Sequence, residues 1–257
     1  SRAITDAMAS YLRSLGGEIH TGVRVRRLAD LPRARVALLD LTPRQIVDIA
    51  GDELPPRVRS AYEGWRYGGA AYKIDYAVEG EVPWTAEPAR RAGTVHLGGP
   101  FEEVAAAERA VAAGRVPDSP FVLVAQQHLA DPSRSAGNVH PLWAYAHVPN
   151  GYDGDLTDAI DGQIERFAPG FRERVVARHV WSPAALEAHN ANYIGGDIAG
   201  GSHGGLQLLG RPRISTDPYW TGVPGLYICS SSTPPGGGVH GMCGANAARS
   251  ALEALRG

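Results

Sequence analysis

The sequence predicts a mixed α/β fold in which the two ends of the chain form one unit and the middle forms another. Near the C-terminus, the apolar run of residues 226–229 leads through a glycine-rich turn into a helical pattern that starts at Met242. This order of strand, turn and helix is typical of α/β proteins. Between residues 70 and 143 the composition favours several strands joined by turns, so we expect an inserted mixed or antiparallel sheet there.

The N-terminal part predicts alternating helices and strands. Residues 1–15 carry apolar side chains at helical spacing, and Gly16-Gly17 ends the pattern. Proline in the first turn marks the start of a helix at Pro43. Before residue 70 we therefore expect a helix over 1–15, strands over 18–28 and 35–41, and helices over 43–50 and 56–65.

The middle of the chain predicts a sheet with two helices. Short runs rich in β-branched and aromatic residues alternate with turn residues, and an alanine-rich stretch interrupts them. The expected strands cover residues 70–78, 93–97, 121–128 and 142–147, and the expected helices cover residues 101–114 and 156–167. His147, at the end of one such strand, is a candidate to face a substrate pocket, although a structural role is the simpler interpretation.

Composition narrows the class of protein. The 257 residues are 44% hydrophobic and 20% charged, as in ordinary globular proteins, and they suffice for a large core. A net charge of −2 argues against binding to nucleic acid. We expect a cytoplasmic protein without a transmembrane segment, because no apolar run could span a bilayer and no leader pattern precedes the first helix. Cys229 and Cys243 fit neither a redox pair nor a disulfide framework.

The glycine-rich turn is the strongest functional signal. Gly236, Gly238 and Gly241 satisfy G-x-G-x-x-G between a strand and a helix, where glycine lets a ligand approach the backbone and the helix N-terminus attracts negative charge. A complete dinucleotide site also needs a following strand with an acidic residue, and the sequence contains none after this helix. A purely structural turn is the alternative.

Residues 225–241, Gly-Leu-Tyr-Ile-Cys-Ser-Ser-Ser-Thr-Pro-Pro-Gly-Gly-Gly-Val-His-Gly, resemble the C-terminal flavin-binding motif of phytoene desaturase-like flavoproteins, the carotenoid desaturase branch of the amine-oxidase-type FAD superfamily. Residues 11–25, 142–151 and 193–202 are also similar to segments of that family. The resemblance implies a Rossmann-like FAD-binding domain and FAD as cofactor. The cofactor-binding residues that it implies are Val25, Ser230, Ser231, Gly237, Gly238, Val239 and Met242.

The resemblance also implies a domain organisation and a reaction. FAD-domain segments would cover residues 1–50 and 191–257, with a substrate domain over residues 51–190. The chain would be the C-terminal portion of an FAD-dependent oxidoreductase that transfers hydride from a hydrophobic small molecule to flavin. The family's N-terminal dinucleotide fingerprint is missing, so we expect the isolated chain to bind FAD poorly. No side chain identifies itself as a catalytic acid or base.

The sequence is also compatible with two other functions. The chain could be a non-catalytic subunit or partner-binding fragment that completes a separate FAD-binding half, on the same or another chain. Alternatively, Gly200-Gly-Ser-His-Gly204 matches G-x-S-x-G, and a serine hydrolase would use Ser202, Asp217 and His240. The strand and helix that should flank a nucleophile elbow are not evident around Ser202. None of the nine histidines lies at a metal-ligand spacing, so we expect no metal site.

Overall fold

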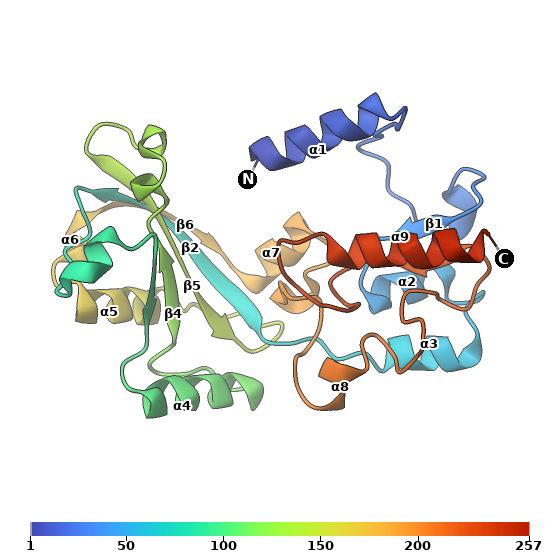
Figure 1. The fold of residues 1–257 in the computed structure, drawn as a ribbon. Coiled ribbons are helices and arrows are strands. Elements are labelled where there is room, and N and C mark those ends of the chain that lie inside the picture. Colours follow the sequence, from blue (N-terminus) through green and yellow to red (C-terminus); the bar gives the residue numbers. More distant parts are fainter. Residues whose placement is uncertain (1, 257) are drawn as a thin grey trace.

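The computed structural model of the protein describes residues 2–256 and shows a mixed α/β fold in two adjoining parts (Figure 1). One part is built on a parallel pair of strands and the other on a five-stranded antiparallel sheet. The predicted fold class is confirmed. The sheet is inserted in the sequence between the two strands of the parallel pair, also as expected.

The parallel pair joins the two ends of the chain. Strand β1 (Ala37–Leu39) pairs with β7 (Leu226–Ile228), and Leu39 lies opposite Ile228. Helices α2 (Pro43–Ala50), α3 (Pro56–Glu63) and α9 (Met242–Ala254) accompany these strands. The two strands, α2, α3 and the turn between these two helices share a small core made of Leu39, Ile46, Ala50, Leu54, Val58, Tyr62, Leu226 and Ile228.

The five-stranded sheet has the order β3-β4-β5-β2-β6, and each neighbouring pair is antiparallel. Alternate residues of each long strand point to opposite faces, so one face can be buried while the other faces outward. Helices α5 (Thr157–Phe167) and α6 (Phe171–Arg174) cover the buried face. The strands are β2 (Ala70–Glu79), β3 (Thr94–Leu97), β4 (Val122–Ala125), β5 (Val139–Val148) and β6 (Val175–Trp181).

The buried face forms the larger core of the molecule. Ile74 of β2, Ala144 of β5 and Ile160 and Ile164 of α5 are fully buried there. The remaining helices are α1 (Arg2–Ser14), α4 (Phe101–Ala112), α7 (Pro183–His189) and α8 (Leu206–Leu209). Short 3-10 turns cover Leu28–Asp30, Glu87–Arg91, Gln127–Leu129, Pro132–Arg134 and Ile194–Gly196.

The predicted strand over residues 18–28 is wrong. These residues form no strand in the structure, and among residues 2–256 they pair with no other strand. The alternating side chains stay largely outside the core, since Val23 is 72% exposed and Ile19 is 41% exposed. An alternating segment becomes a strand only when a neighbour takes its backbone hydrogen bonds, and here no neighbour is present in the described part of the chain.

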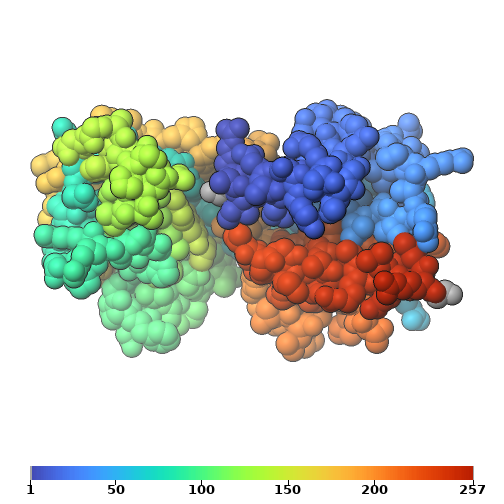
Figure 2. All heavy atoms as spheres, turned by 45° about the horizontal axis from the view of Figure 1, so that its top comes forward, coloured from blue at the N-terminus to red at the C-terminus, as the bar shows by residue number. Residues whose placement is uncertain are grey.

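Helix α1 forms as predicted but buries nothing. Ile4, Met8, Tyr11 and Leu15 are each more than 60% exposed, although they share one side of the helix. Figure 2 shows the N-terminal segment on the outside of the molecule, and in Figure 1 α1 stands away from α9. Ser1 and Gly257, at the limits of the predicted domains, lie outside the described residues. No helix within residues 2–256 is long and apolar enough to cross a membrane.

Candidate functional site

The carboxyl ends of β1 and β7 define the candidate site. Because the strands are parallel and in register, Asp40 and Cys229 leave the sheet at the same edge, and the Cys229 N–H donates to the carbonyl of Leu39 (2.9 Å). Open parallel sheets bind ligands outside this edge. Two features lie here: the loop from Ser230 to Gly241, and a cavity on the other side of Asp40.

The serine part of the loop is held from within. The Ser232 hydroxyl donates to the carbonyl of Gly200 (2.6 Å), and the Thr233 hydroxyl donates to the carbonyl of Ser230 (2.8 Å). The Ser230 hydroxyl accepts the N–H of Ser232 (3.3 Å). Ser230 and Ser232 are buried, whereas Ser231 is half-exposed. Ser231 is therefore the serine best placed to offer its hydroxyl to a ligand.

The glycine part of the loop is exposed from residue 237 to residue 241, whereas Gly236 is buried. Gly236, Gly238 and Gly241 adopt φ values of +104°, +148° and +64°, which L side chains rarely adopt. Apart from the adjacent residues and the backbone of α9 itself, no atom of residues 2–256 lies within 4 Å of the position that a Cβ would take at Gly236, Gly241 or Gly244. Val239, at the tip of the turn, is fully exposed.

Helix α9 begins directly after this turn. Gly241 is its N-cap, and the Met242 N–H donates to Nδ1 of His240 (3.0 Å). The Cys243 thiol donates to the carbonyls of Thr233 and Gly236 (3.5 and 3.4 Å), which ties the first turn of the helix to the loop. The first N–H groups of a helix have no partner within the helix, and its dipole favours negative charge at this end.

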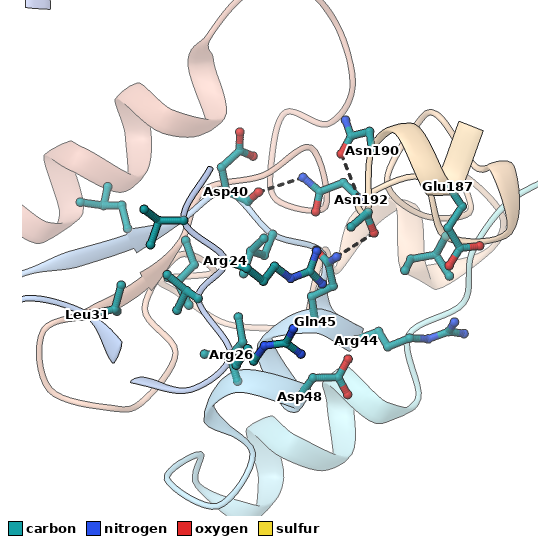
Figure 3. Close-up of a pocket in the computed structure, with 18 residues that line it drawn as sticks. Arg24, Arg26, Leu31, Asp40, Arg44, Gln45, Asp48, Glu187, Asn190 and Asn192 are labelled. Atoms are coloured by element: carbon teal, nitrogen blue, oxygen red, sulfur yellow. Dashed lines mark hydrogen bonds between the residues drawn. The ribbon is translucent and has the colours of Figure 1, made fainter. Parts of the chain in front are cut away.

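The cavity beside Asp40 has a volume of about 690 Å³ (Figure 3). Its walls come from residues 23–26, the end of β1, helix α2 and residues 187–194. Side-chain amides fix these walls: Asn192 donates to the carbonyl of Asp40 (2.9 Å), and Gln45 donates to the carbonyl of Ala191 (2.7 Å). The cavity is therefore shaped by the same carboxyl edge that positions the loop.

Charged side chains surround the cavity. Arg24, Arg26 and Arg44 line it together with Asp40 and Asp48, and Figure 3 shows these side chains around the same opening. Desolvation by burial raises the pKa of Asp40 above its usual value. The three guanidinium groups are potential partners for phosphate or carboxylate groups of a ligand, while the carboxylates of Asp40, Asp48 and Glu187 oppose their charge in the same lining.

The predicted cofactor residues fall in two places. Val25 lines the cavity, whereas Ser230, Ser231, Gly237, Gly238, Val239 and Met242 lie in the loop and at the start of α9. The loop residues are thus close in sequence and space, but the cavity itself contains none of them. Their contacts with a cofactor stay a prediction.

The hydrolase triad is not assembled in the described part of the chain. The Ser202 hydroxyl accepts the N–H of Gly204, and Asp217 accepts the N–H groups of Tyr219 and Trp220. His240 accepts the Met242 N–H, and no hydrogen bond links Ser202, Asp217 and His240 within residues 2–256. Ser202 also lies in an irregular segment rather than between a buried strand and a helix.

Sequence reasoning missed a buried cation behind the loop. Arg211 is 3% exposed, and its Nη2 donates to the carbonyl of Ser231 (3.2 Å). Its guanidinium lies 5.4 Å from the ring centroid of Trp65, which is also buried. The Nε and Nη1 atoms of Arg211 and the Nε1 atom of Trp65 have no hydrogen-bond partner within residues 2–256. Burial lowers the pKa of Arg211, and the charge of Asp197 opposes that shift.

Comparisons with known proteins point to oxidoreductases. No family model matches the chain. Over 103 residues, or 38% of this chain, it is 39% identical to the mouse and 38% identical to the rat "Pyridine nucleotide-disulfide oxidoreductase domain-containing protein 2". These matches cover 17% of each relative, so the chain spans only a small part of their length.

A solved structure shares the fold. An oxidoreductase from Methanosarcina mazei matches 98% of this chain with a TM-score of 0.58 and 16% sequence identity, and the match covers 54% of that protein. At this identity the likeness shows the fold alone. The chain thus has the fold of about half of a known oxidoreductase chain.

Proposed function

We propose that this chain is the C-terminal portion of an FAD-dependent oxidoreductase. The observation that supports this proposal most strongly is the glycine turn that leads from the carboxyl end of β7 into the N-terminus of α9 and leaves space beside its backbone. Similarity to oxidoreductases in sequence and in fold supports the same class. The motif resemblance adds the narrower proposal of a phytoene dehydrogenase-like flavoprotein that acts on a hydrophobic small molecule.

The residues present fit a flavin. The positions of Gly236, Gly241 and Gly244 leave space that a side chain would fill, so a planar group could approach the backbone closely. Ser231 would offer a hydroxyl, and the first turn of α9 would stabilise negative charge on the ligand. A bound flavin would supply the hydride acceptor. The cavity at Val25, with Arg24 and Arg26, would take the adenine and phosphate end.

The outward face of the five-stranded sheet is the proposed substrate surface. Trp143, Tyr145 and His147 of β5 alternate with the buried core residues, and successive ring centroids lie 6.0 and 5.7 Å apart. All three side chains are half-buried. Nδ1 of His147 is hydrogen-bonded to the carboxylate of Glu108 on α4 (2.9 Å), which fixes the orientation of the imidazole. Rigid aromatic side chains give a substrate apolar contact with little loss of conformational freedom.

The same proposal accounts for surfaces that stay uncovered in the described chain. The apolar side of α1 is exposed, and residues 18–28 include the cavity-lining segment at residues 23–26. We propose that a further FAD-binding half covers them, on the same or another chain. The relatives are longer than this chain, which supports such a half. The chain would then be one part of the enzyme and not a self-sufficient one.

A charge placed at the tip of the turn tests the proposal. Val239 is fully exposed, so Val239→Asp should leave the fold intact while placing a carboxylate where the flavin is expected. Phe101→Asp, at another highly exposed apolar position at the start of α4, is the matched control. We expect FAD affinity, measured by flavin fluorescence in the protein with its FAD-binding half, to fall at least about tenfold for Val239→Asp only. Equal affinity in both variants would contradict the proposed site.

A further inference from the structure

Arg211 occupies an unusual position for an arginine. It is almost completely buried, yet only one of its three side-chain nitrogens donates a hydrogen bond within residues 2–256. A buried charge is normally retained only with partners that satisfy it, because desolvation costs several kcal/mol. The nearest compensation is electrostatic and comes from Asp197, which is itself buried.

Asp197 is already occupied by the backbone. It accepts the N–H of Gly68 and the N–H of Ala199, each at 2.7 Å. It therefore offsets the charge of Arg211 from a distance, without a hydrogen bond between the two side chains. The positive charge of Arg211 is left only partly balanced.

Arg211 is packed against the back of the loop. Its Nη2 holds the carbonyl of Ser231, and Gly200 on the neighbouring segment leaves no room for a side chain beside Ser231. Gly201 likewise lies so close to Trp65 that a Cβ would meet the indole ring. Arg211 and Gly200 thus contact Ser231 directly, and Trp65 packs behind them against Gly201 and Arg211.

The loop also links Arg211 to the start of α9. Arg211 donates to the carbonyl of Ser231, and the Cys243 thiol in the first turn of that helix donates to the carbonyl of Thr233, two residues further along the same loop. The positive end of the α9 dipole and a partly balanced guanidinium therefore act on the same loop. In a buried environment such charges are weakly screened.

We propose that Arg211 is an electrostatic positioning residue that, together with the N-terminus of α9, favours negative charge on the ligand held at the glycine turn. This inference rests on the proposed flavin function. For a flavin, the reduced form carries more negative charge than the oxidised form, so a positive charge behind the loop raises the reduction potential. Arg211 needs no contact with the ligand for this effect, because it acts through its field and through the carbonyl of Ser231.

The test measures the reduction potential of the flavin-loaded protein, with its FAD-binding half present. In Arg211→Gln, the preference for reduced over oxidised flavin should fall about tenfold, which for a two-electron couple is a potential about 30 mV lower. Arg211→Lys keeps the charge and should stay within about threefold of the wild type. Arg66→Gln removes the same charge from an exposed neighbour of Trp65 and should change nothing measurable.

The outcomes separate the inference from the function on which it rests. An unchanged potential in Arg211→Gln, or an equal loss in Arg211→Lys, would overturn the role of the charge. If Arg211→Gln does not fold, Asp197→Asn serves instead, since it removes the opposing charge and should raise the potential; an unchanged or lower potential would overturn the inference. A wild-type protein that binds no flavin would refute the proposed function, and this inference with it.

Discussion

The substitution Gly244→Leu should separate ligand binding from folding. Gly244 is the third residue of α9, and apart from the adjacent residues and the helix backbone no atom of the described chain lies within 4 Å of the position of a Cβ there. Leucine is a better helix former than glycine by roughly 0.5–1 kcal/mol, so the fold should be unchanged or slightly stabilised. For a chain of this size that gain corresponds to a rise in Tm of about 1–4 °C.

The same leucine should obstruct a ligand that approaches the first turn of α9. We expect FAD affinity to fall at least about a hundredfold, equivalent to about 2.8 kcal/mol, in fluorescence titrations of the protein with its FAD-binding half. Ala254→Leu, at the exposed far end of the same helix, is the control and should bind as the wild type does. A Gly244→Leu protein that folds and binds FAD normally would refute the placement of the cofactor at α9.

Three further predictions concern stability and reactivity. Ile228→Ala empties a fully buried position between β1 and α2 and should lower the free energy of unfolding in urea by about 2–5 kcal/mol; a loss below about 1 kcal/mol would show that this core is loosely packed. Burial raises the pKa of Tyr62 to about 12, so the neutral phenol should contribute about 2–3 kcal/mol to the free energy of unfolding below pH 10, and this contribution should disappear as the pH rises towards 12. The free energy of unfolding of Tyr62→Phe, measured over the same pH range, should lack this decline. Identical pH profiles for the variant and the wild type would contradict the prediction. Burial also raises the pKa of Cys229 to about 12, so iodoacetamide at neutral pH should modify it at least about tenfold more slowly in the folded than in the unfolded chain, as followed by mass spectrometry; equal rates would disagree with the structure.

Elements with strong local signals were predictable from the sequence. Helix α2 has the predicted bounds, because Pro43 fixes its first turn and its apolar residues face the core. Strands β2 and β5 were expected because core and outward side chains alternate along them. Helix α7 was missed although Ser182 and Pro183 give a start signal, and the Ser182 hydroxyl does accept the N–H of Ala185 (3.2 Å).

Elements that depend on partners were not predictable. Strand β6 exposes most of its residues and is a strand only because it pairs with β2 at the edge of the sheet. Residues 18–28 show the opposite case. Their alternating pattern predicts a strand, but no strand in the described chain pairs with them, so no strand forms. The division into domains at residues 50 and 190 stays a prediction.

The candidate site was also predicted only in part, because a local motif is visible in the sequence whereas contacts between distant segments are not. The loop residues from Ser230 to Met242 belong to one continuous motif, so their proximity followed from the sequence. The three arginines of the cavity come from two separate segments, and only the fold brings Arg24 and Arg26 next to Arg44. Arg211 carried no signal in the sequence, because its importance lies in its burial and in its unsatisfied nitrogens.

The most direct measurement is the visible absorbance spectrum of the purified chain after incubation with FAD and desalting, made with the chain alone and with the FAD-binding half restored. The account predicts a colourless chain alone and a retained flavin spectrum once the half is restored. A protein that stays colourless in both cases would contradict the flavin function. Flavin retained tightly by the chain alone would contradict the claim that it is one part of a larger site.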